Sequence, residues 1–535
     1  NQTLFNAPIG IAVKDDKIFI ADTYNDKIRV IENGNVRTIA GSERGFADST
    51  IALQAKFDTP CGIAIDKNGD VLIADTINRR IRKIDANGFV STVIGSETRE
   101  TINGFADKTS FVEPVGVHVD RFGTIYVSDE GANAIRVFGR QIVNFSETFT
   151  GGNRGLIDAN LLESKFNRPA NVAFDNEGNL LIADSANKLV RIVEPENSNI
   201  GAAIDENAAK NLFISAEDLK KSLEPRWTYN PPQNPREIAG TFGEIRGFVK
   251  ENERSTRFHN GLDIAGGFGE TARFLKSEKV LRPIAAENFG GLRELLRLPN
   301  LGYIHISLGR DANQKLFDDA RFQFQTDANR KLTGVRVRRG AKFQTGEAIG
   351  TLNPMNHVHL IAGESGNEMN AFTALNLPDV KDTVAPKIEK VAVYDENWRE
   401  LNQAVSGKIR VTARAFDQLN GNLARRKLGV FRLGYQILDS NNQINADNFP
   451  TISFERIPTD ENEAAKLYAT GSQSGATGET VFNYIVTNNL QNGIAREDFF
   501  DTTKLQNGDY TIRVFAADFF GNKSAQDLKI KLQNP

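Results

Sequence analysis

Residues 60–84, PCGIAIDKNGDVLIADTINRRIRKI, decide the fold of the first part of the chain. An apolar run follows Pro-x-Gly, a second run ends in aspartate, and a third contains an isoleucine–arginine pair. Short β-branched runs separated by Asn, Asp and Gly predict short strands joined by turns. Similar stretches begin at Pro8, Pro114 and Pro169, so the four units recur about 52 to 55 residues apart. Self-similarity at this period indicates a propeller or a solenoid.

A fourth strand is predicted in the first two units, at VRTIAGS (36–42) and VSTVIGS (90–96). Four strands per unit make a propeller blade. The order and spacing of these strands, with the intervening segment GFADSTIALQAKFDTP (45–60), resemble NHL repeats. The resemblance covers residues 1–195 and implies a β-propeller used for binding. Four units leave three alternatives open: a small closed ring, an open arc, or a ring completed by upstream residues.

Each unit also carries an aspartate and an arginine seven residues apart. The pairs are Asp22/Arg29, Asp75/Arg82, Asp129/Arg136 and Asp184/Arg191. In three units an asparagine follows the aspartate at the third position, which is typical of an Asx turn. The pairs could form a ligand surface, but polar residues fixed by a repeat usually serve the fold, so we expect them to hold the turns of each blade. His118, which replaces Ala12 and Ala64 of other units, is predicted to be a packed strand residue.

The composition limits the class of protein. With 535 residues the chain is long enough for several domains. Its net charge of −3 argues against a nucleic-acid-binding protein, which is usually basic. No apolar run approaches the roughly 18 residues that a membrane helix needs. The single cysteine, Cys61, excludes an intrachain disulfide. Because the chain starts at Asn1, either a signal peptide has been removed or the sequence begins inside a longer chain.

The repeat ends near residue 195, and residues 196–235 are predicted to be a linker. SAEDLKKSLE (215–224) is expected to form a short helix with Ser215 at its N-cap. PRWTYNPPQNP (225–235) contains four prolines and is expected to be an extended spacer. The next segment, REIAGTFGEIRGF (236–248), could be the outer strand of a fifth blade or the opening strand of a new domain. The residues that follow it favour the new domain.

Four of the five histidines lie within about one hundred residues of one another. They are His259 in FHNGLD, His305 in YIH, and His357 and His359 in NHVHL. The last two are two residues apart in a strand-like run, so their side chains share one face. Asp263 follows His259 at the fourth position, with Gly261 permitting a bend between them. A catalytic zinc takes three protein ligands and leaves a position for water, and hydrolysis also needs a base and an oxyanion donor. Four histidines and one aspartate supply three ligands and two such helpers.

Residues 236–380 resemble the lysostaphin-type zinc endopeptidases, which cut peptide bonds in bacterial peptidoglycan. The matching motifs, in order, are TFGEIRG, H-x-x-x-D, Y-x-H, RRGAKFQTGEAIG, H-x-H and NAFTAL. The resemblance implies that Zn²⁺ is held by His259, Asp263 and His359, and that His357 is the general base. It also implies that His305 stabilises the tetrahedral intermediate and shares in proton transfer. Three segments depart from the family: MNHVHLIA (355–362), where the family usually has Gly-Pro-His-Leu-His-Phe; 283–300, where we expect a short helix; and a polar insertion at 309–333.

Residues 381–535 are predicted to form a β-sandwich. DTVAPKIEKVAVYD (382–395) and YTIRVFAAD (510–518) alternate as strands, and Gly521-Asn522 indicates a hairpin. The region resembles the immunoglobulin-like or fibronectin-like sandwiches of bacterial surface proteins. Its edge strands could pair with another chain, giving a homo-oligomer or a surface assembly. The chain as a whole is therefore expected to be a multidomain all-β protein.

These features predict a secreted or cell-surface zinc metalloendopeptidase located in the extracellular space, in the periplasm or on the cell surface. Its partner would be peptidoglycan or a protein substrate, and the propeller and sandwich would bind or assemble. No nucleic acid and no transmembrane segment are expected. The alternative is a non-catalytic structural or adhesive surface protein that assembles through its β modules, with a vestigial or merely stabilising zinc site.

Overall fold

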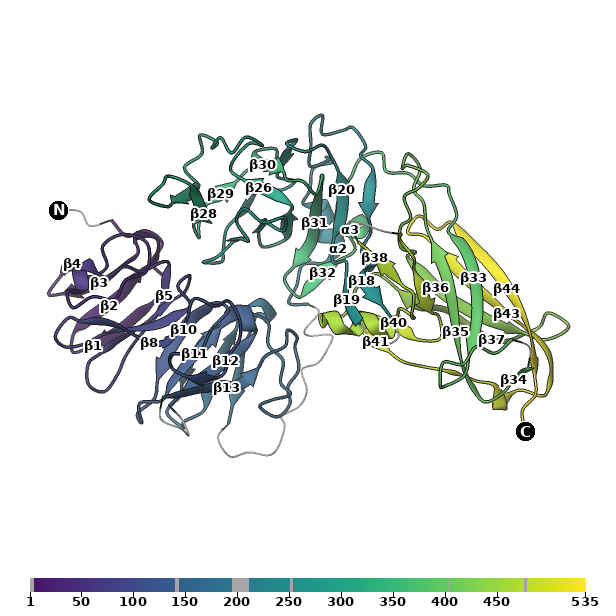
Figure 1. Cartoon of the computed structure of the whole chain (residues 1–535), viewed down its shortest axis with the longest axis horizontal. Helices are drawn as coiled ribbons and strands as arrows, with labels where there is room; N and C mark the ends of the chain where they lie inside the picture. The colour runs from purple at the N-terminus through teal and green to yellow at the C-terminus, as the bar shows by residue number, and fades with distance from the viewer. Residues whose placement is uncertain (1–3, 140–143, 195–210, 251–253, 403, 476–478) are drawn as a thin grey trace. The chain divides into compact units, whose positions relative to one another are not determined.

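The computed structural model describes residues 4–139, 144–194, 211–250, 254–402, 404–475 and 479–535. The chain forms two compact units: unit 1, residues 1–213 with 338–340, and unit 2, residues 214–337 and 341–535. Strands dominate both units, which confirms the predicted all-β class (Figure 1). Within the described ranges, no helix has the length and apolar character needed to cross a membrane.

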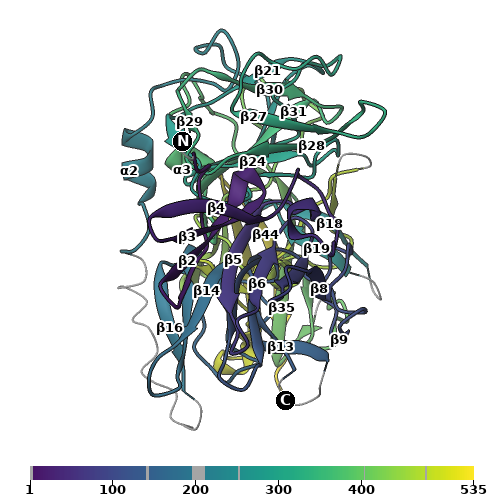
Figure 2. The same cartoon turned by 90° about the vertical axis from the view of Figure 1, so that its left-hand side faces the viewer.

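Unit 1 contains four antiparallel sheets that follow the four sequence repeats, coloured purple to blue in Figure 2. They are β1 (Ile11–Lys14), β2 (Lys17–Asp22), β3 (Lys27–Glu32) and β4 (Asn35–Ala40); β5 (Pro60–Ile65), β6 (Val71–Asp75), β7 (Arg80–Ile84) and β8 (Val90–Gly95); β10 (Pro114–Val119), β11 (Ile125–Asp129), β12 (Ala134–Phe138) and β13 (Phe145–Gly151) with β9 (Gly104–Phe105); and β14 (Pro169–Phe174), β15 (Leu180–Asp184) and β16 (Leu189–Val193). The fourth strands predicted for the first two units are β4 and β8. Small apolar cores between successive sheets, built from residues such as Ile28, Ile73 and Val127, join each blade to the next.

The aspartate–arginine pairs hold the blades together, as expected, in three of the four units. Asp75 accepts hydrogen bonds from Arg82 at 2.7 Å and from Asn78 at 2.9 Å. The pairs Asp22/Arg29 and Asp184/Arg191 are joined at 2.9 and 3.2 Å. The predicted D-x-x-N contact is present in each of these units. These side chains therefore serve the turns and strands of the propeller.

The third unit uses different contacts. Its sequence, DEGAN, puts Ala132 where the other units have the bridging asparagine. Asp129 still accepts hydrogen bonds from the backbone of Val112 and Glu113, as Asp75 and Asp184 do from the backbone before their own blades, but Arg136 donates to the side chain of Asn103. His118 in β10 is a half-buried strand residue whose ring lies 5.4 Å from that of Phe174, as the sequence predicts.

The segment expected to be a spacer belongs instead to the core of unit 2. Residues 196–210 of the predicted linker lie outside the described residues, and α2 (Ala216–Lys221) follows with Ser215 as its N-cap. Trp227 and Tyr229 are fully buried in the largest apolar core of the unit. The hydroxyl of Tyr229 donates to Ile264 O and accepts from Val358 N. Burial of these two aromatic side chains outweighs the extended preference of the surrounding prolines.

The first half of unit 2 is built around one antiparallel sheet, and residues 238–240 of the segment 236–248 form its first strand, paired with β20. Residues 245–248 of the same segment belong to a second, smaller sheet. Its strand order is β17 (Ile238–Gly240), β20 (Leu262–Ala265), β31 (His357–Glu364), β25 (Leu301–Ile304), β24 (Leu295–Arg297) and β23 (Ala286–Glu287), with β32 (Asn367–Met369) beside β31. Smaller sheets surround it: β21 (Thr271–Arg273), β30 (Ala348–Leu352) and β26 (Ile306–Leu308); β22 (Glu278–Lys279) with β29 (Lys342–Phe343); β27 (Phe322–Thr326) with β28 (Leu332–Val337); and β18 (Ile245–Val249), β19 (Arg254–Phe258) and β38 (Gln473–Ser474). α3 (Ala371–Ala374) follows β32.

The short helix expected within 283–300 is absent, although all of these residues are described. The segment forms β23, β24 and turns instead. Its Glu294 is buried and binds Arg310 through two 2.7 Å contacts, which ties the segment to the chain beyond β26. The insertion at 309–333 contributes β27 and the start of β28, which pair as a hairpin.

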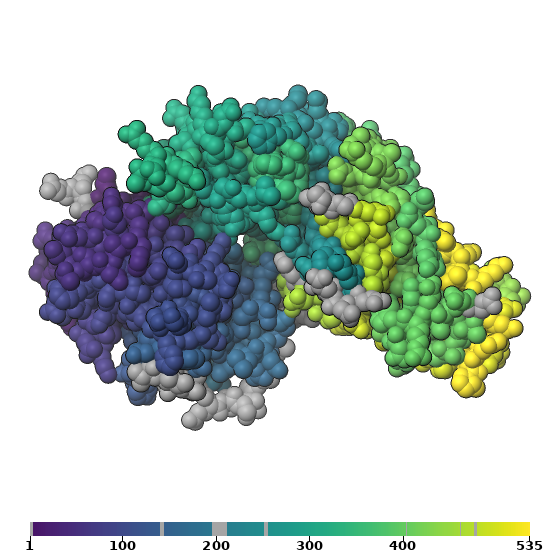
Figure 3. Space-filling view, viewed as in Figure 1, coloured from purple at the N-terminus to yellow at the C-terminus, as the bar shows by residue number. Residues whose placement is uncertain are grey.

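The second half of unit 2 consists of two sheets with a common apolar core. One has the order β34 (Ala404–Val405), β44 (Lys523–Leu532), β43 (Gly508–Ala517), β36 (Arg432–Leu438), β37 (Ile444–Ser453), β40 (Asn489–Gln491) and β41 (Ile494–Arg496); the other contains β33 (Lys387–Tyr394), β35 (Lys408–Phe416) and β39 (Asn483–Ile485), with β42 (Phe500–Asp501) on β35. Ile245 and Phe258 of the β18–β19 hairpin belong to this core. In Figure 3 the teal residues of the first half of unit 2 meet the green and yellow residues of the second. The hairpin that leads into His259 is therefore held by the C-terminal sheets.

Candidate metal centre

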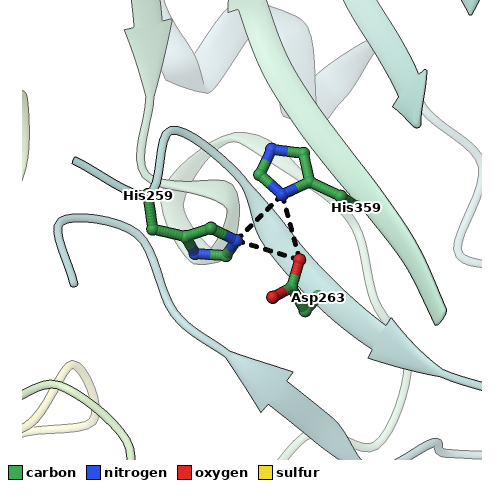
Figure 4. A group of neighbouring side chains, drawn as sticks. All are labelled: His259, Asp263 and His359. Atoms are coloured by element: carbon green, nitrogen blue, oxygen red, sulfur yellow. Dashed lines mark hydrogen bonds and ion pairs between the residues drawn. The ribbon is translucent and has the colours of Figure 1, made fainter. Parts of the chain in front are cut away.

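Strand register brings the predicted ligands together. Asp263 in β20 lies directly opposite His359 in β31, so their side chains project from the same face of the sheet. His259 comes immediately after β19, in the turn that leads into β20. Figure 4 shows its ring and the other two side chains pointing toward one another. The structure thus brings together three residues that span one hundred positions of sequence.

The three candidate ligand atoms form a small triangle. Nε2 of His259 is 2.9 Å from both Oδ1 of Asp263 and Nδ1 of His359, and the latter two atoms are 3.0 Å apart. A cation placed off this plane can approach all three atoms at the roughly 2.0–2.2 Å that zinc takes. All three side chains are buried, so the site has the dry walls that strengthen metal–ligand interactions.

The tautomers of both imidazoles suit a metal. Nδ1 of His259 lies 2.7 Å from the carbonyl oxygen of Thr241, which can only accept, so this nitrogen carries the proton. Nε2 of His359 lies 3.0 Å from Oδ1 of Asn260 and donates in the same way. The remaining nitrogen of each ring therefore turns a lone pair toward the triangle. Two lone pairs and a carboxylate oxygen at 2.9–3.0 Å repel one another unless a cation or proton lies among them.

The charges of the site favour the protonation states that a metal needs. Burial and the neighbouring His259 lower the pKa of His359 to about 3, so its imidazole is neutral near pH 7. Burial opposes ionisation of Asp263, but His259, His359 and Arg246 together hold its pKa well below the usual range. The neutral imidazole of His359 and the carboxylate of Asp263 are in the protonation states in which these groups bind a catalytic zinc.

The sequence did not assign a role to Arg246 or Glu244, although both lie in the quoted TFGEIRG motif. Arg246 donates to Oδ2 of Asp263 at 2.8 Å and to Glu244 at 2.5 Å. Glu244 is buried and also accepts from Thr241 N at 2.7 Å and Gly429 N at 3.0 Å. These hydrogen bonds, from Glu244 through Arg246, fix the carboxylate of Asp263 so that Oδ1 faces the two histidines. In the sequence, the only signal for this hydrogen-bonded network was the alternation of the charged residues Glu244 and Arg246 with apolar residues.

Two glycines allow this close packing. A Cβ on Gly261 would lie 2.6 Å from Leu360 O and 2.7 Å from Nε2 of His359. A Cβ on Gly240 would lie 2.2 Å from the guanidinium of Arg246 and 2.8 Å from Oδ2 of Asp263. All four distances are too short for real side chains, so the His259–Asp263 turn and the arginine that supports it require glycine at these positions.

Replacing Arg246 with methionine is expected to weaken zinc binding by about 10- to 100-fold, because the partners that orient metal ligands carry effects of this size. The zinc affinity of Arg246→Lys should lie between those of the parent and Arg246→Met. Lysine keeps the positive charge but lacks the planar guanidinium group that binds both carboxylates. Competition with a chromophoric chelator at pH 7 measures the affinity. Arg321→Met, at the ion pair with Asp319, is the matched control. An unchanged affinity in Arg246→Met would contradict the proposed orienting role.

The two predicted helper histidines lie beside the triangle. Nε2 of His357 is 3.5 Å from Oδ1 of Asp263, while its Nδ1 lies 2.7 Å from Met355 O and donates to it. The ring centroid of His305 is 4.6 Å from that of His357, and its Nδ1 donates to Leu292 O at 2.6 Å. Each ring thus keeps Nε2 as an acceptor. Both residues are half-buried, so they form the side of the cluster that reaches solvent.

His305 also adopts an unusual backbone conformation. Its φ of 70° places it in the left-handed region, between β25 and β26, where the chain passes from one sheet to another. A non-glycine residue in this region costs on the order of 1–3 kcal/mol, and such strain clusters at functional sites. Burial lowers the pKa of His305 to about 4, so the ring is neutral near pH 7. The Leu292 loop that orients this ring was not foreseen from the sequence.

Comparison with known proteins identifies the first part of the chain. Residues 43–105 match the Teneurin NHL domain. Unit 1 carries NHL repeats. Human NHL repeat-containing protein 2 is 25% identical over 262 residues, covering 42% of this chain and 36% of that protein. A probable peptidyl-alpha-hydroxyglycine alpha-amidating lyase of Caenorhabditis elegans is 29% identical over 123 residues, which are 23% of this chain and 33% of that protein.

The chain spans about one third of the length of the NHL repeat-containing relatives from human and chicken. Among solved structures, an auxiliary nutrient binding protein from Bacteroides ovatus is 17% identical, with a TM-score of 0.30, over 36% of this chain and 49% of that protein. The family match and the NHL repeat-containing relatives support an NHL-repeat, β-propeller-type architecture for unit 1.

Proposed function

We propose that residues 236–380 form a lysostaphin-type zinc metalloendopeptidase that cleaves peptide crosslinks of peptidoglycan, in a secreted or cell-surface protein. The observation that carries the proposal is the arrangement of the imidazoles. His259 and His359 each donate their outer N–H to an oxygen and direct the other nitrogen at Oδ1 of Asp263, at 2.9 and 3.0 Å. Such outer hydrogen bonds fix the tautomer and raise the basicity of metal-bound histidines.

The residues fit zinc, whose ligands would be His259, Asp263 and His359. When bound, the ion lowers the pKa of water toward neutrality and polarises the substrate carbonyl. His357 is the group best placed to accept the proton of the attacking water, because its Nε2 is an acceptor 3.5 Å from Oδ1 of Asp263. General-base assistance of this kind contributes about 10²- to 10⁴-fold.

His305 is proposed to share in proton transfer by exchanging a proton with His357. With its proton on Nδ1, its Nε2 can accept but cannot donate to an oxyanion. Proton uptake must therefore precede any stabilisation of the tetrahedral intermediate by this ring. The T-shaped contact between His305 and His357 places the two rings for such an exchange. In this proposal the propeller and the C-terminal sheets, which we propose to be an immunoglobulin-like sandwich, serve binding or assembly.

Removing the metal tests the proposal directly. The full chain, stripped with dipicolinic acid, should lose the ability to release soluble fragments from purified peptidoglycan sacculi, and an equivalent of Zn²⁺ should restore it. Casein, assayed in parallel, separates a cell-wall enzyme from a general protease. If the zinc-loaded chain releases nothing from either substrate, the peptidase proposal is wrong and the non-catalytic surface scaffold takes its place.

A further inference from the structure

A second group of acidic side chains lies far from the histidines in the sequence. Asp382, Asp417 and Asp518 each offer one carboxylate oxygen, and these oxygens lie within 4.8 Å of one another. Asp417 follows β35 of one C-terminal sheet and Asp518 follows β43 of the other. Asp382 lies in the segment between α3 and β33. The cluster thus joins three separate parts of unit 2.

These carboxylates are buried and poorly satisfied by the protein. Asp417 is 7% exposed, Asp518 3% and Asp382 9%. Oδ1 of Asp417 and Oδ2 of Asp382 are buried and accept no hydrogen bond from any described residue. The other oxygen of Asp382 accepts from Val384 N at 3.0 Å. A buried carboxylate oxygen without a partner requires a proton, a water or a cation.

The remaining contacts orient the carboxylates and do not neutralise them. Asp518 accepts from Asn522 N at 2.8 Å and from its side-chain amide at 2.6 Å. The same amide also donates to Asp382 O at 3.1 Å. Burial raises the pKa of Asp417 to about 8, and the negative charges of Asp518 and Asp382 add to that rise. The described side chains therefore provide negative charge without a matching positive charge.

We propose that Asp382, Asp417 and Asp518 bind a calcium ion. An all-oxygen carboxylate set suits hard cations, and calcium accepts six to eight oxygens in flexible geometry. Opposite ligands of calcium lie about 4.6–5.2 Å apart, so oxygens within 4.8 Å of one another fit inside one coordination sphere. Magnesium holds its ligands at about 2.0–2.1 Å and keeps most of its water, so it suits this wider set less well.

The ion would fasten the C-terminal sheets to the proposed peptidase domain. The backbone of Asp417 pairs with that of Leu428 and closes the loop between them. Within this loop Asn422 exchanges two hydrogen bonds with the backbone of Ile238 in β17, at 3.1 and 2.8 Å. Just beyond it, Gly429 N donates to Glu244, the residue that binds Arg246. Calcium at Asp417 would thus stabilise the loop that supports the strands of the metal centre.

Thermal unfolding of the full chain, followed by tryptophan fluorescence, tests the proposal. Both tryptophans, Trp227 and Trp398, belong to unit 2, so they report the relevant part of the chain. For protein freed of metal, 1 mM CaCl₂ should raise the Tm by about 5 °C or more if the Kd is near 10 µM. MgCl₂ at the same concentration should have a smaller effect. Equal effects of the two ions would overturn the assignment to calcium.

Asp417→Asn separates calcium binding from simple repulsion among carboxylates. Without calcium this variant should have a higher Tm than the parent at pH 8, because one buried charge is removed. Calcium should no longer raise the Tm of this variant. Asp527→Asn, at the exposed Arg513 pair, is the matched control and should keep the rise. A parent protein whose Tm is unchanged up to 10 mM CaCl₂ would show that the three aspartates share protons and bind no calcium.

A calorimetric titration with CaCl₂ in the His359→Ala background completes the test. This variant lacks a ligand of the histidine site, so calcium uptake there cannot account for the signal. One equivalent of calcium should bind, and the Asp417→Asn substitution should abolish binding in the same background. Binding that persists after Asp417→Asn would place the calcium elsewhere and overturn the proposal.

Discussion

His359→Ala is expected to abolish zinc binding and hydrolysis together, whereas His357→Ala should retain zinc and lose only hydrolysis. His359 is one corner of the 2.9–3.0 Å triangle, and its removal leaves two ligands where a catalytic zinc needs three. His357 lies outside the triangle, with Nε2 3.5 Å from Asp263. Its loss should lower kcat by about 10²- to 10⁴-fold, the usual contribution of a general base.

Two measurements on the same protein preparations distinguish the variants. Zinc content after dialysis, measured by mass spectrometry, reports the ligand role, and fragment release from peptidoglycan sacculi reports hydrolysis. His118→Ala is the control, because this histidine packs on Phe174 in unit 1. It should leave both quantities unchanged. Loss of zinc from His357→Ala would show that His357 is a ligand, and full activity in that variant would exclude it as the base.

The structure also indicates which features local sequence patterns can and cannot predict. The pairing of His357 with His359 on one face follows from the two-residue period of a strand, and the blades follow from repetition. The contact of Arg246 in β18 with Asp263 in β20 joins strands of two different sheets, an arrangement that no local pattern encodes. The tautomer of His305 depends on Leu292, a residue in a turn that was expected to be helical.

The segment 225–235 illustrates how tertiary burial overrides a local preference. Its prolines predict an extended spacer, and local composition gives no weight to two large aromatic side chains. In the structure Trp227 donates to Pro378 O, and Tyr229 joins β20 to β31 through Ile264 and Val358. Both side chains are fully buried. A tryptophan and a tyrosine within three residues of one another were the available signal that this segment belongs to a core.

Arg82→Met is expected to destabilise the propeller by about 3–5 kcal/mol, the usual cost of breaking a buried ion pair by removing one partner. The Arg82 side chain is fully buried and binds Asp75 at 2.7 Å and Asp48 at 2.6 Å. It also donates to the backbone carbonyls of Ala47 and Lys56. Its removal leaves the Asp75 carboxylate without its positive partner. It also releases Asp48 and the backbone of Ala47 and Lys56, which precede β5.

Arg29→Met is the matched control because Arg29 occupies the same repeat position and binds an aspartate of its own unit. Arg29 is 15% exposed and binds only Asp22 and Thr38 through its side chain among the described residues. We expect a smaller loss of stability than for Arg82→Met, because the Arg29 side chain is partly exposed and makes fewer contacts. Urea unfolding followed by circular dichroism measures both variants, while tryptophan fluorescence reports unit 2. Equal losses of unfolding free energy in the two variants would show that the contacts of Arg82 with Asp48, Ala47 and Lys56 do not add to stability.

The cost of Arg82→Met should also increase with pH. Burial raises the pKa of Asp75 to about 7, and the charge of Arg82 opposes that rise. Without Arg82 the folded-state pKa rises further, while that of the unfolded chain stays at about 3.9. The folded variant then binds a proton that the unfolded chain releases, so its stability falls as the pH rises through this interval. The deficit relative to the parent should be larger at pH 8 than at pH 5, and adding Asp75→Asn should remove the difference. A deficit that is the same at both pH values would mean that its source is lost packing and hydrogen bonding, because an uncompensated carboxylate must titrate.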